Sequence, residues 1–376
     1  MAQTASIDQF LSGIYYTIGQ PSSYSGVRKL WSEVKKRQSK PRGITLTVVS
    51  KWLKEQTTHN IHSTPKTIFS TEHIIVEHID EQWDSDIIQM DQLAQYNRGY
   101  KYILICIDIF SRYAWARPLK FKKSTDVTIA FTDIVKMSGR ICKTIHTDQD
   151  GEYTGASFQR MLHNKGINHM IAYGRHKASY SERFNRTLEN KLFKYFYEQQ
   201  TAMYIDILDD VMFSYNNTIH HSINMAPATV NTANAHTIYE QVYIPILNRW
   251  ANTPVKFTIA LGSLVRLSLY TAPFSRGYHE KWTEELFTVC NQIPSHPPRY
   301  KVQDLNGDSI KGSFYTEELL VASVQNINDI TYKIDRVLKT KTVRGHKLSL
   351  VKWYGYSDKF NTYIPTASIR HYKGKI

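Results

Sequence analysis

Three acidic residues, far apart in the sequence, stand where the chain is expected to return to one edge of a sheet. Asp86 opens the strand predicted in SDIIQMDQLA, and Asp148 ends the strand predicted in ICKTIHTD. Glu182 lies in KASYSERFNRTLENKLFKYF, a strongly helical stretch. One helix and one strand are expected between Asp148 and Glu182, which is enough to bring the chain back to the same sheet end. Converging carboxylates of this kind suit Mg²⁺, which prefers carboxylate oxygens and water.

Phosphoryl transfer between nucleic-acid strands uses such a set of carboxylates. The chemistry needs two divalent cations about 3.5–4 Å apart, one to activate the attacking oxygen and one to stabilise the leaving oxygen. We therefore expect Mg²⁺, or Mn²⁺, with two ions per active site. Three unrelated surface carboxylates would have the same spacing, so the surrounding sequence has to decide between these interpretations.

The elements that would position these acids follow from a change of pattern between residues 86 and 235. Hairpin-linked strands come first, and alternating helices and strands follow, which indicates a mixed α/β sheet. Ser124 is the expected N-cap of the first helix and Gly166 closes the second. Strands are predicted at 85–94, 100–110, 112–120, 141–148 and 167–172, and helices at 124–138, 157–166, roughly 178–200 and 202–218.

The flanking segments predict three smaller modules. Residues 1–72 hold short helices, one capped by Ser25 and one by Thr45 or Thr47, and we expect a helix-turn-helix or winged-helix DNA-binding domain with a linker. The core spans residues 73–240. Short strands and turn signals predict a small barrel at 255–325 and a second β module at 328–376.

The charge distribution favours a polyanionic partner. Residues 1–70 carry ten basic and three acidic side chains, residues 328–376 carry eleven and three, and the centre is close to neutral. The basic segments 1–70 and 328–376 suit binding to phosphate-rich DNA, although two ordinary solvated surfaces would have the same net charges.

Cysteine and hydropathy patterns exclude other classes of protein. The three cysteines are far apart and form no Cys-x-x-Cys pair, and no cysteine lies near the histidine-containing linker 58–75, so we expect no zinc. The first residues lack the features of a secretory signal, and the longest apolar run, 103–110, is far too short to span a membrane. We expect an intracellular protein with no membrane partner.

Several strings of residues are specific enough to indicate a family. These are YKYILICIDIFSRYAWARPL, then HTDQDGEY, then KASYSERFNRTLENK. YSGVRKLW near the start and FSRGYHEKWTEELF near residue 280 accompany them. With these strings the chain resembles retroviral-type DDE integrases, most specifically those of Maverick/Polinton elements, which some virophages also carry. The resemblance covers nearly the whole chain.

The resemblance implies an RNase H-like core in which Asp86, Asp148 and Glu182 bind the metal ions. Asp84 and Asp91 are alternatives for the first acid, but counting back from the YNRGYKY hairpin favours Asp86. Asp108, inside the apolar second strand, is interpreted as structural. The family pattern after the second acid is usually Asp-x-Gly-x-Glu-Phe, whereas here Gly151 comes one place late, so Asp150 competes with Asp148 for the metal.

Basic and amide side chains near the acids and in the barrel are candidates for DNA contact. Asn185 and Arg186 lie on the same helical face as Glu182, and Lys177 lies near the helix start. The barrel resembles the SH3-like barrel that follows the core in such integrases, although a barrel that only spaces protomers would have the same pattern. The predicted DNA-binding residues are Lys177, Asn185, Arg186, Arg266, Arg276 and Lys281.

The last module resembles a chromodomain. Its strings ITYKIDRVL, LVKWYGY and NTYIP place Tyr332, Trp353 and Tyr356 where chromodomains surround a methylated lysine with aromatic faces. Tyr363 replaces the usual Trp, and the basic charge of the module would rather favour DNA than a basic histone tail.

Taken together, these features predict a DNA integrase that processes the 3′ ends of a mobile-element or viral DNA and joins them to host DNA. Joining two ends requires two active sites, so we expect a homo-oligomer, a dimer or a tetramer. We expect it in the host nucleus, or packaged in a virion, with element-end DNA, target DNA and a methylated histone tail as candidate partners. The alternatives are a nuclease that cuts without joining and an inactive, domesticated DNA- or chromatin-binding protein.

Overall fold

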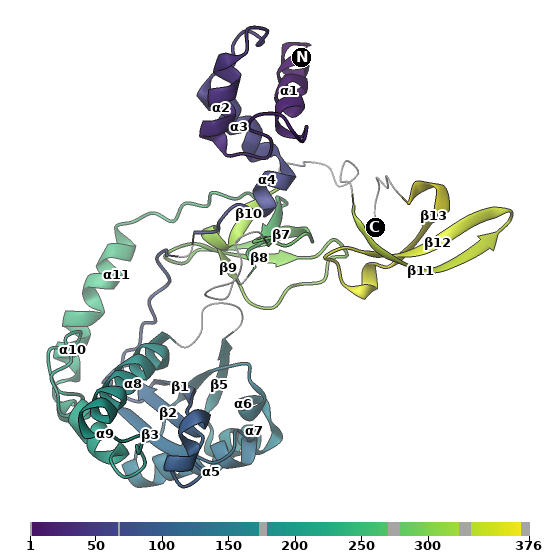
Figure 1. Ribbon diagram of the computed structural model, residues 1–376. Helices are drawn as coiled ribbons and strands as arrows, with labels where there is room; N and C mark the ends of the chain where they lie inside the picture. Colours follow the sequence, from purple (N-terminus) through teal and green to yellow (C-terminus); the bar gives the residue numbers. More distant parts are fainter. Residues whose placement is uncertain (1, 67, 173–178, 270–278, 323–331, 370–376) are drawn as a thin grey trace. The chain divides into compact units, whose positions relative to one another are not determined.

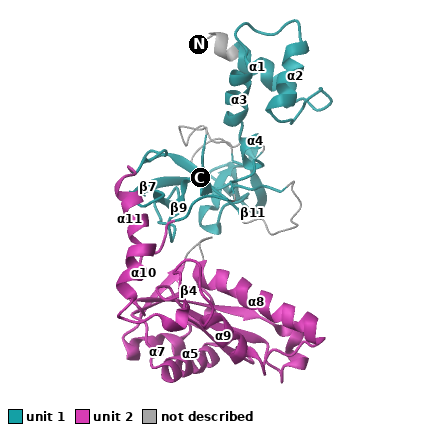
Figure 2. Cartoon of the chain, turned by 90° about the vertical axis from the view of Figure 1, so that its left-hand side faces the viewer, with its two compact units in different colours: residues 1–71, 255–376 teal, residues 72–254 magenta. Residues whose placement is uncertain are grey.

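The computed structural model describes residues 2–66, 68–172, 179–269, 279–322 and 332–369. Figure 2 shows the chain as two compact units, one formed by residues 1–71 and 255–376 and the other by residues 72–254. In the described part of the chain no helix is long and apolar enough to cross a membrane.

The second unit is built on a mixed five-stranded sheet in the order β3-β2-β1-β4-β5 (Figure 1). The first three strands form an antiparallel meander, while β4 pairs parallel with both β1 and β5. The parallel pairs follow from the helices that separate these strands in the sequence, because only a crossover connection can return a chain in the same direction. The strands are β1 (Gln82–Gln89), β2 (Tyr102–Asp108), β3 (Ala114–Leu119), β4 (Thr144–Asp148) and β5 (Asn168–Ala172).

Helices cover both faces of this sheet. One face carries α5 (Ser124–Ser138) and α7 (Ala156–Lys165), with the short α6 (Gly151–Thr154) between them in the sequence, around a core that contains Trp83 and Phe131. The other face carries α8 (Ser179–Gln199) and α9 (Leu208–Asn216). The unit ends with α10 (Ala235–Val242) and α11 (Ile244–Ala251). The mixed α/β core predicted from the sequence is therefore confirmed.

Helix α8 is held on the sheet by one apolar stripe. Its buried apolar residues are Phe184, Leu188, Leu192 and Phe196. They recur every four residues, which places them on one side of a helix with 3.6 residues per turn. Each side chain removed from water stabilises the helix position by about 1.5–3 kcal/mol, so α8 is a fixed support for the polar residues on its flanks.

Strand β1 differs from its predicted position. It begins at Gln82, so Asp86 lies inside the strand and does not open it, and Asp91 lies in the 3₁₀ turn Asp91–Tyr96. The apolar side chain of Trp83 explains the earlier start, because it packs in the core against the α5 side of the sheet. A tertiary contact therefore extends the strand beyond the alternation visible in the sequence.

Two predicted N-caps are different and one is confirmed, and the predicted C-cap Gly166 is confirmed at the end of α7. The N-cap of α5 is Lys123, and Ser124 Oγ instead accepts the Phe158 backbone N–H of α7 at 3.1 Å. Ser25 does not cap α2 (Val27–Lys36), because its hydroxyl donates to the Ser22 carbonyl. Thr45 caps α3 (Leu46–Glu55), where its hydroxyl accepts the Val48 N–H.

The first unit combines helices at its N-terminal end with two antiparallel sheets. Its helices are α1 (Ala2–Tyr15), α2, α3 and α4 (Thr57–Ile61). One sheet has the order β10-β6-β7-β8-β9 and the other the order β11-β12-β13. These strands are β6 (Leu264–Leu267), β7 (Phe287–Ile293), β8 (Arg299–Gln303), β9 (Phe314–Tyr315), β10 (Leu319–Val321), β11 (Ile334–Val343), β12 (His346–Trp353) and β13 (Thr362–Pro365).

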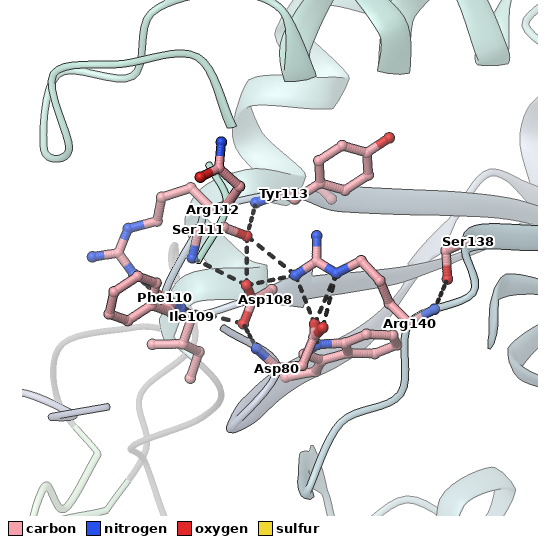
Figure 3. A network of polar contacts seen from close by, with 12 residues as sticks. Asp80, Asp108, Ile109, Phe110, Ser111, Arg112, Tyr113, Ser138 and Arg140 are labelled. Atoms are coloured by element: carbon pink, nitrogen blue, oxygen red, sulfur yellow. Dashed lines mark hydrogen bonds and ion pairs between the residues drawn. The ribbon is translucent and has the colours of Figure 1, made fainter. Parts of the chain in front are cut away.

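Asp108, at the end of β2, is the centre of a buried polar network (Figure 3). Its carboxylate is fully buried, lies 2.8 Å from an Arg140 guanidinium nitrogen and accepts hydrogen bonds from Ser111. Arg140 also pairs with Asp80 at 2.6 Å. Burial raises the pKa of the Asp108 carboxyl, while Arg140 and Ser111 oppose that rise. These contacts support the structural interpretation of Asp108, since they link the strand ends of the meander to the segment after α5.

Replacing Arg140 with Met should therefore destabilise the protein strongly. The change leaves the buried Asp108 carboxylate without its cation, and loss of one partner of such a pair costs about 3 kcal/mol or more. The urea midpoint of unfolding measures this loss. Arg160→Met, which removes an exposed arginine of α7, should change the unfolding free energy by less than about 0.5 kcal/mol. Equal midpoints for the two variants would contradict the structural role of the network.

Candidate active site

The register of β1 and β4 brings two of the predicted acids to the same level of the sheet. Asp84 lies opposite His146 in this parallel pair, so Asp86 and Asp148 follow two residues later along each strand. Residues two apart in a strand point to the same face. That face is the one covered by α8, since Ile88, which continues the same alternation, packs in the cluster that contains Phe184 and Leu188.

Asp84, on the same face, is fully buried and forms hydrogen bonds with residues of neighbouring elements. His146 Nδ1 lies 3.1 Å from Asp84 Oδ1, and the Tyr180 backbone N–H donates to Asp84 Oδ2 at 3.1 Å. A carboxylate only accepts hydrogen bonds, so Nδ1 of His146 carries the proton in this contact. Asp84 therefore ties the first turn of α8 to β1 and β4, which favours a positioning role for it over direct metal binding.

Asp86 is linked to the helix that carries the third predicted acid. The Asn185 side-chain amide donates to Asp86 Oδ2 at 2.8 Å, and the Ile87 N–H donates to Oδ1 at 2.8 Å. Glu182 lies on α8 one helical turn before Asn185, is exposed, and pairs with Arg186 at 3.3 Å. The Asn185–Asp86 contact thus brings the Glu182 turn of α8 toward the strand that carries Asp86.

The donor chemistry of Asp86, Asp148 and Glu182 fits a hard divalent cation, because all the ligand atoms are carboxylate oxygens. Among the residues that the structure describes, however, no group of three or more His, Cys, Asp or Glu side chains is arranged to hold a metal ion. The fold therefore brings Asp86 and Asp148 to one level and Glu182 to the adjacent helix, without closing the three into a finished cluster.

Asp150, the alternative second acid, takes part in a different contact. Lys122 Nζ lies 2.8 Å from Asp150 Oδ2 and 2.9 Å from Glu152 Oε1. Burial lowers the pKa of Lys122, but its hydrogen bonds to Asp150 and Glu152 raise that pKa by more, so it rises overall. Asp150 is thus held beside a cation at the start of α6, which favours Asp148 as the metal ligand.

A chain of hydrogen bonds supports Asp148 from the opposite face of the sheet. Gln159 Nε2 donates to His169 Nδ1 at 2.7 Å, and His169 Nε2 lies 2.8 Å from Thr147 Oγ1. The Thr147 hydroxyl in turn donates to the Asp148 carbonyl at 2.9 Å. Burial, and then the nearby His146, lower the pKa of His169, which favours its neutral form. The last residue of β4 is therefore fixed by side chains of β5 and α7.

Two of the predicted DNA contacts lie outside the described residues, and one is wrong. Lys177 and Arg276 are not described. Arg266 is buried in β6, where its guanidinium donates to the carbonyls of Thr283 and Glu284 at 2.7 and 2.6 Å. Because these contacts occupy it within the five-stranded sheet of the first unit, Arg266 does not present its charge to DNA.

The remaining predicted DNA contacts have exposed or linking positions. Lys281 Nζ donates to Thr64 Oγ1 at 2.8 Å, next to a backbone bond from Lys281 to Ile61. Arg186 is 71% exposed on its side chain. Arg186 therefore keeps the accessibility that contact with a DNA backbone requires, while Lys281 also links its own segment to α4.

The predicted aromatic cage in the last module is not open in this structure. Trp353 is fully buried, and Tyr332 and Tyr356 are 5% and 7% exposed. The ring of Tyr332 lies 5.7 Å from that of Trp353 and 5.6 Å from that of Tyr356, and all three pack with Leu286 and Phe360. This corrects the sequence-based prediction, because the three rings form the module's hydrophobic core and leave no ring face for a methylated lysine.

The supporting roles of several residues were not identified from the sequence, although Asp84 was named there as an alternative first acid. Asp84 and His146 had a recognisable signal, since each stands two positions before a predicted metal ligand on the same face of its strand. His169 and Lys122 had none, because their partners come from distant elements.

Comparison with known proteins agrees with the geometry of the second unit. Residues 77–175 match the family model of the integrase core domain. This part of the chain is therefore similar to an integrase core domain. Glu182 lies beyond the matched range, so its assignment rests on the fold and on the resemblance of the surrounding string.

Curated relatives come from mobile elements and retroviruses. An uncharacterised transposon-derived protein of Caenorhabditis elegans is 29% identical over 222 residues, which are 59% of this chain and 74% of that protein. The Pol polyprotein of transposon gypsy from Drosophila melanogaster is 26% identical over 39% of this chain, and the Pro-Pol polyprotein of simian foamy virus type 3 is 29% identical over 35%. The matched regions span only 14% and 11% of these two polyproteins.

One solved structure matches more than the integrase core. A chain of the simian T-cell lymphotropic virus intasome in complex with PP2A regulatory subunit B56 gamma aligns with a TM-score of 0.52. The alignment covers 76% of this chain and 93% of that chain at 14% identity. At this identity the match supports the fold, and the activity has to be argued from the site.

The support behind Asp148 can be tested with a pair of threonine variants. Thr147→Val should cost about 1–3 kcal/mol, because the half-buried Asp148 carbonyl and His169 imidazole lose their common hydroxyl partner. Thr147→Ser keeps the hydroxyl and should recover most of that loss. Urea unfolding measures both variants, and a serine variant as unstable as the valine variant would show that methyl packing, not hydrogen bonding, is what matters.

The lowered pKa of His169 also predicts a pH dependence of stability. The unfolded state takes up a proton on this residue near pH 6.5, whereas the folded state resists protonation. Stability should therefore fall as the pH drops below about 6.5. Unfolding free energies at pH 7.5 and 5.5 should differ more for the wild type than for His169→Gln. If the unfolding free energy of His169→Gln changed between these pH values as much as that of the wild type, His169 would not be the source of the pH dependence.

Proposed function

We propose that this protein is a DNA integrase, a divalent-metal-dependent polynucleotidyl transferase that trims the 3′ ends of a mobile-element or viral DNA and joins them to another DNA. The supporting observation is the β1–β4 register, which sets Asp86 and Asp148 at one level beneath the helix of Glu182. Residues 77–175, a range that includes Asp86 and Asp148, match the integrase core domain, and this match supports the proposal.

In this proposal Asp86, Asp148 and Glu182 hold two Mg²⁺ or Mn²⁺ ions. When bound, such ions lower the pKa of an attacking water and neutralise charge on the scissile phosphate and leaving oxygen. The chain's own residues fix the ligands. Asn185 orients Asp86 through its 2.8 Å hydrogen bond, while the Thr147 contact holds the Asp148 backbone. Prearranged ligands of this kind reduce the reorganisation that the reaction requires.

The same groups would serve both reactions. In trimming, water is the nucleophile, and the bond to the terminal nucleotides breaks to leave a free 3′-hydroxyl. In joining, that hydroxyl attacks a phosphodiester of the target, one P–O bond forms and one breaks, and the new 3′-hydroxyl of the target leaves. No protein–DNA covalent bond is needed, so no nucleophilic side chain has to stand at the site.

The wider assignment follows the basic segments and the sequence resemblance. We propose element-end DNA and target DNA as substrates, a homo-oligomer as the working form and the host nucleus as the location. The Maverick/Polinton subtype, the helix-turn-helix character of the first helices and the chromodomain-like character of residues 328–376 belong to the same proposal. Because the predicted cage rings are buried, DNA is preferred over a methylated histone tail as the partner of the last module.

A strand-transfer assay with a labelled DNA end and a plasmid tests the function. Wild-type protein should give joined products with Mg²⁺ or Mn²⁺ and none after chelation. Glu182→Gln should reduce trimming and joining by at least about a hundredfold, because it removes a metal ligand, while DNA binding measured by gel shift stays at the wild-type level. Products that are cut but never joined would indicate a nuclease, and binding without either product an inactive DNA-binding protein.

Matched asparagine variants test the assignment of the other two ligands. Asp86→Asn and Asp148→Asn should abolish both reactions, whereas Asp91→Asn and Asp150→Asn should retain activity within about tenfold. Asp91→Asn is the control for Asp86→Asn, and Asp150→Asn is the control for Asp148→Asn. Each variant removes one negative charge from the same segment as its control, so the comparison separates metal binding from general electrostatics. Loss of activity in Asp150→Asn with retention in Asp148→Asn would transfer the second ligand position to Asp150.

A further inference from the structure

A cavity away from the acid site lies within the second unit, beside α8. It has a volume of about 700 Å³, which is in the range of ligand-binding pockets. Tyr180, Arg183, Thr187 and Lys191 of α8 form one wall, and the segment 218–222 forms another. Asn185, which contacts Asp86, is not among the lining residues. The cavity is therefore on a different flank of α8 from the acids.

The wall of this cavity contains a buried arginine without an acidic partner. Arg112, in the turn between β2 and β3, is 5% exposed. Its guanidinium donates to the Ile109 carbonyl and to Ser222 Oγ and lies 4.3 Å from the centre of the Tyr180 ring. All three of these neighbours are neutral, and no ion pair of Arg112 occurs within the described ranges. A buried charge that is not paired is costly, so its retention calls for an anion.

Arg140 shows the usual way in which the charge of a buried arginine is compensated, which is pairing with carboxylates. It pairs with both Asp80 and Asp108, and Figure 3 shows the Arg112 side chain extending away from these carboxylates. Arg112 also has a φ of 63°, a left-handed conformation that is uncommon outside glycine. The backbone is thus held in an unfavourable conformation that directs a guanidinium toward the cavity and away from two nearby acids.

The other residues of the cavity are basic, neutral or apolar. Arg183 and Lys191 add two cations, and no Asp or Glu occurs among the lining residues that the structure describes. Lys191 Nζ donates to Ser214 Oγ at 3.2 Å, which is a neutral contact. Burial, and then the charges of Arg112 and the neighbouring His221, lower the pKa of His220 to about 4, so this imidazole is neutral near pH 7 and can donate or accept a hydrogen bond.

We propose that this cavity binds a phosphate group, with Arg112 at its inner wall and with Arg183 and Lys191 on α8. A guanidinium fork matches two phosphate oxygens at once, and the lysine adds a point charge. Three cations without a lining acid favour a strongly anionic group over a neutral sugar or amide.

DNA backbone is the source of this phosphate that the position of the cavity favours. Glu182 and Asn185 lie on another flank of the same helix, within about two and a half turns of Arg183 and Lys191. A strand that reaches the acid site could therefore leave a neighbouring phosphate in the cavity. This identification of the source rests on the proposed integrase function, whereas the phosphate site itself rests only on the cavity and its charges.

Thermal unfolding of the full chain with inorganic phosphate tests the site without DNA or metal ions. Phosphate should raise the Tm of the wild type by about 2–4 °C relative to chloride at equal ionic strength. The rise should be lost in Arg183→Gln/Lys191→Gln and kept in the control Lys136→Gln/Arg160→Gln, which removes two exposed charges from α5 and α7. Arg112→Lys, which keeps the charge but not the fork, should bind phosphate about tenfold more weakly. No rise in the wild type, or an equal rise in all variants, would overturn the site.

Salt-dependent binding of a DNA duplex without terminal phosphates tests the source. Loss of backbone contacts at the cavity should reduce the slope of log affinity against log salt by about one to two in Arg183→Gln/Lys191→Gln, relative to the control double variant. An unchanged slope together with a lost phosphate response would overturn DNA as the source and assign the site to a free phosphorylated molecule. Neither measurement involves catalysis, so failure of the strand-transfer assay is distinguishable from failure of this proposal.

Discussion

The parallel pairing of β1 with β4 is the constraint on which the arrangement of the acids depends. It sets Asp84 beside His146, and the two-residue repeat of a strand then fixes Asp86 and Asp148 on the same face. A shift of one residue would turn the acids toward the α5 side of the sheet and bury charge among Trp83 and Phe131. The hydrophobic pattern of the sheet therefore also determines the position of the carboxylates.

The polar contacts around this pair connect the sheet to the surrounding helices. Asp84 accepts a hydrogen bond from the backbone in the first turn of α8, and Asn185 of the same helix donates one to Asp86. The hydrogen bond between Thr147 and His169 links the end of β4 to β5. The apolar stripe of α8 supplies most of the free energy that holds the helix, while these hydrogen bonds fix its register on the strand. Stability and placement are thus provided by different flanks of one helix.

Two arginines near the end of β2 differ in how their charge is compensated, Arg140 from the segment after α5 and Arg112 from the turn after β2. Arg140 is paired with Asp108 and Asp80 and serves the fold. Arg112 lies only four residues after Asp108 in the sequence but points elsewhere, with neutral neighbours and a strained backbone. The difference in pairing explains why one arginine is interpreted as structural and the other as part of a binding site.

The sequence by itself determined the mixed α/β core, the long helix of Glu182 and the integrase resemblance, because these depend on local periodicity and on short continuous strings. It did not determine the start of β1, the partners of Arg266 or the burial of Trp353, because each depends on contacts with residues distant in the chain. Basic and aromatic residues are ambiguous in sequence, since the same side chain serves a surface or a core. Only the tertiary structure, which decides what surrounds each side chain, separates these roles.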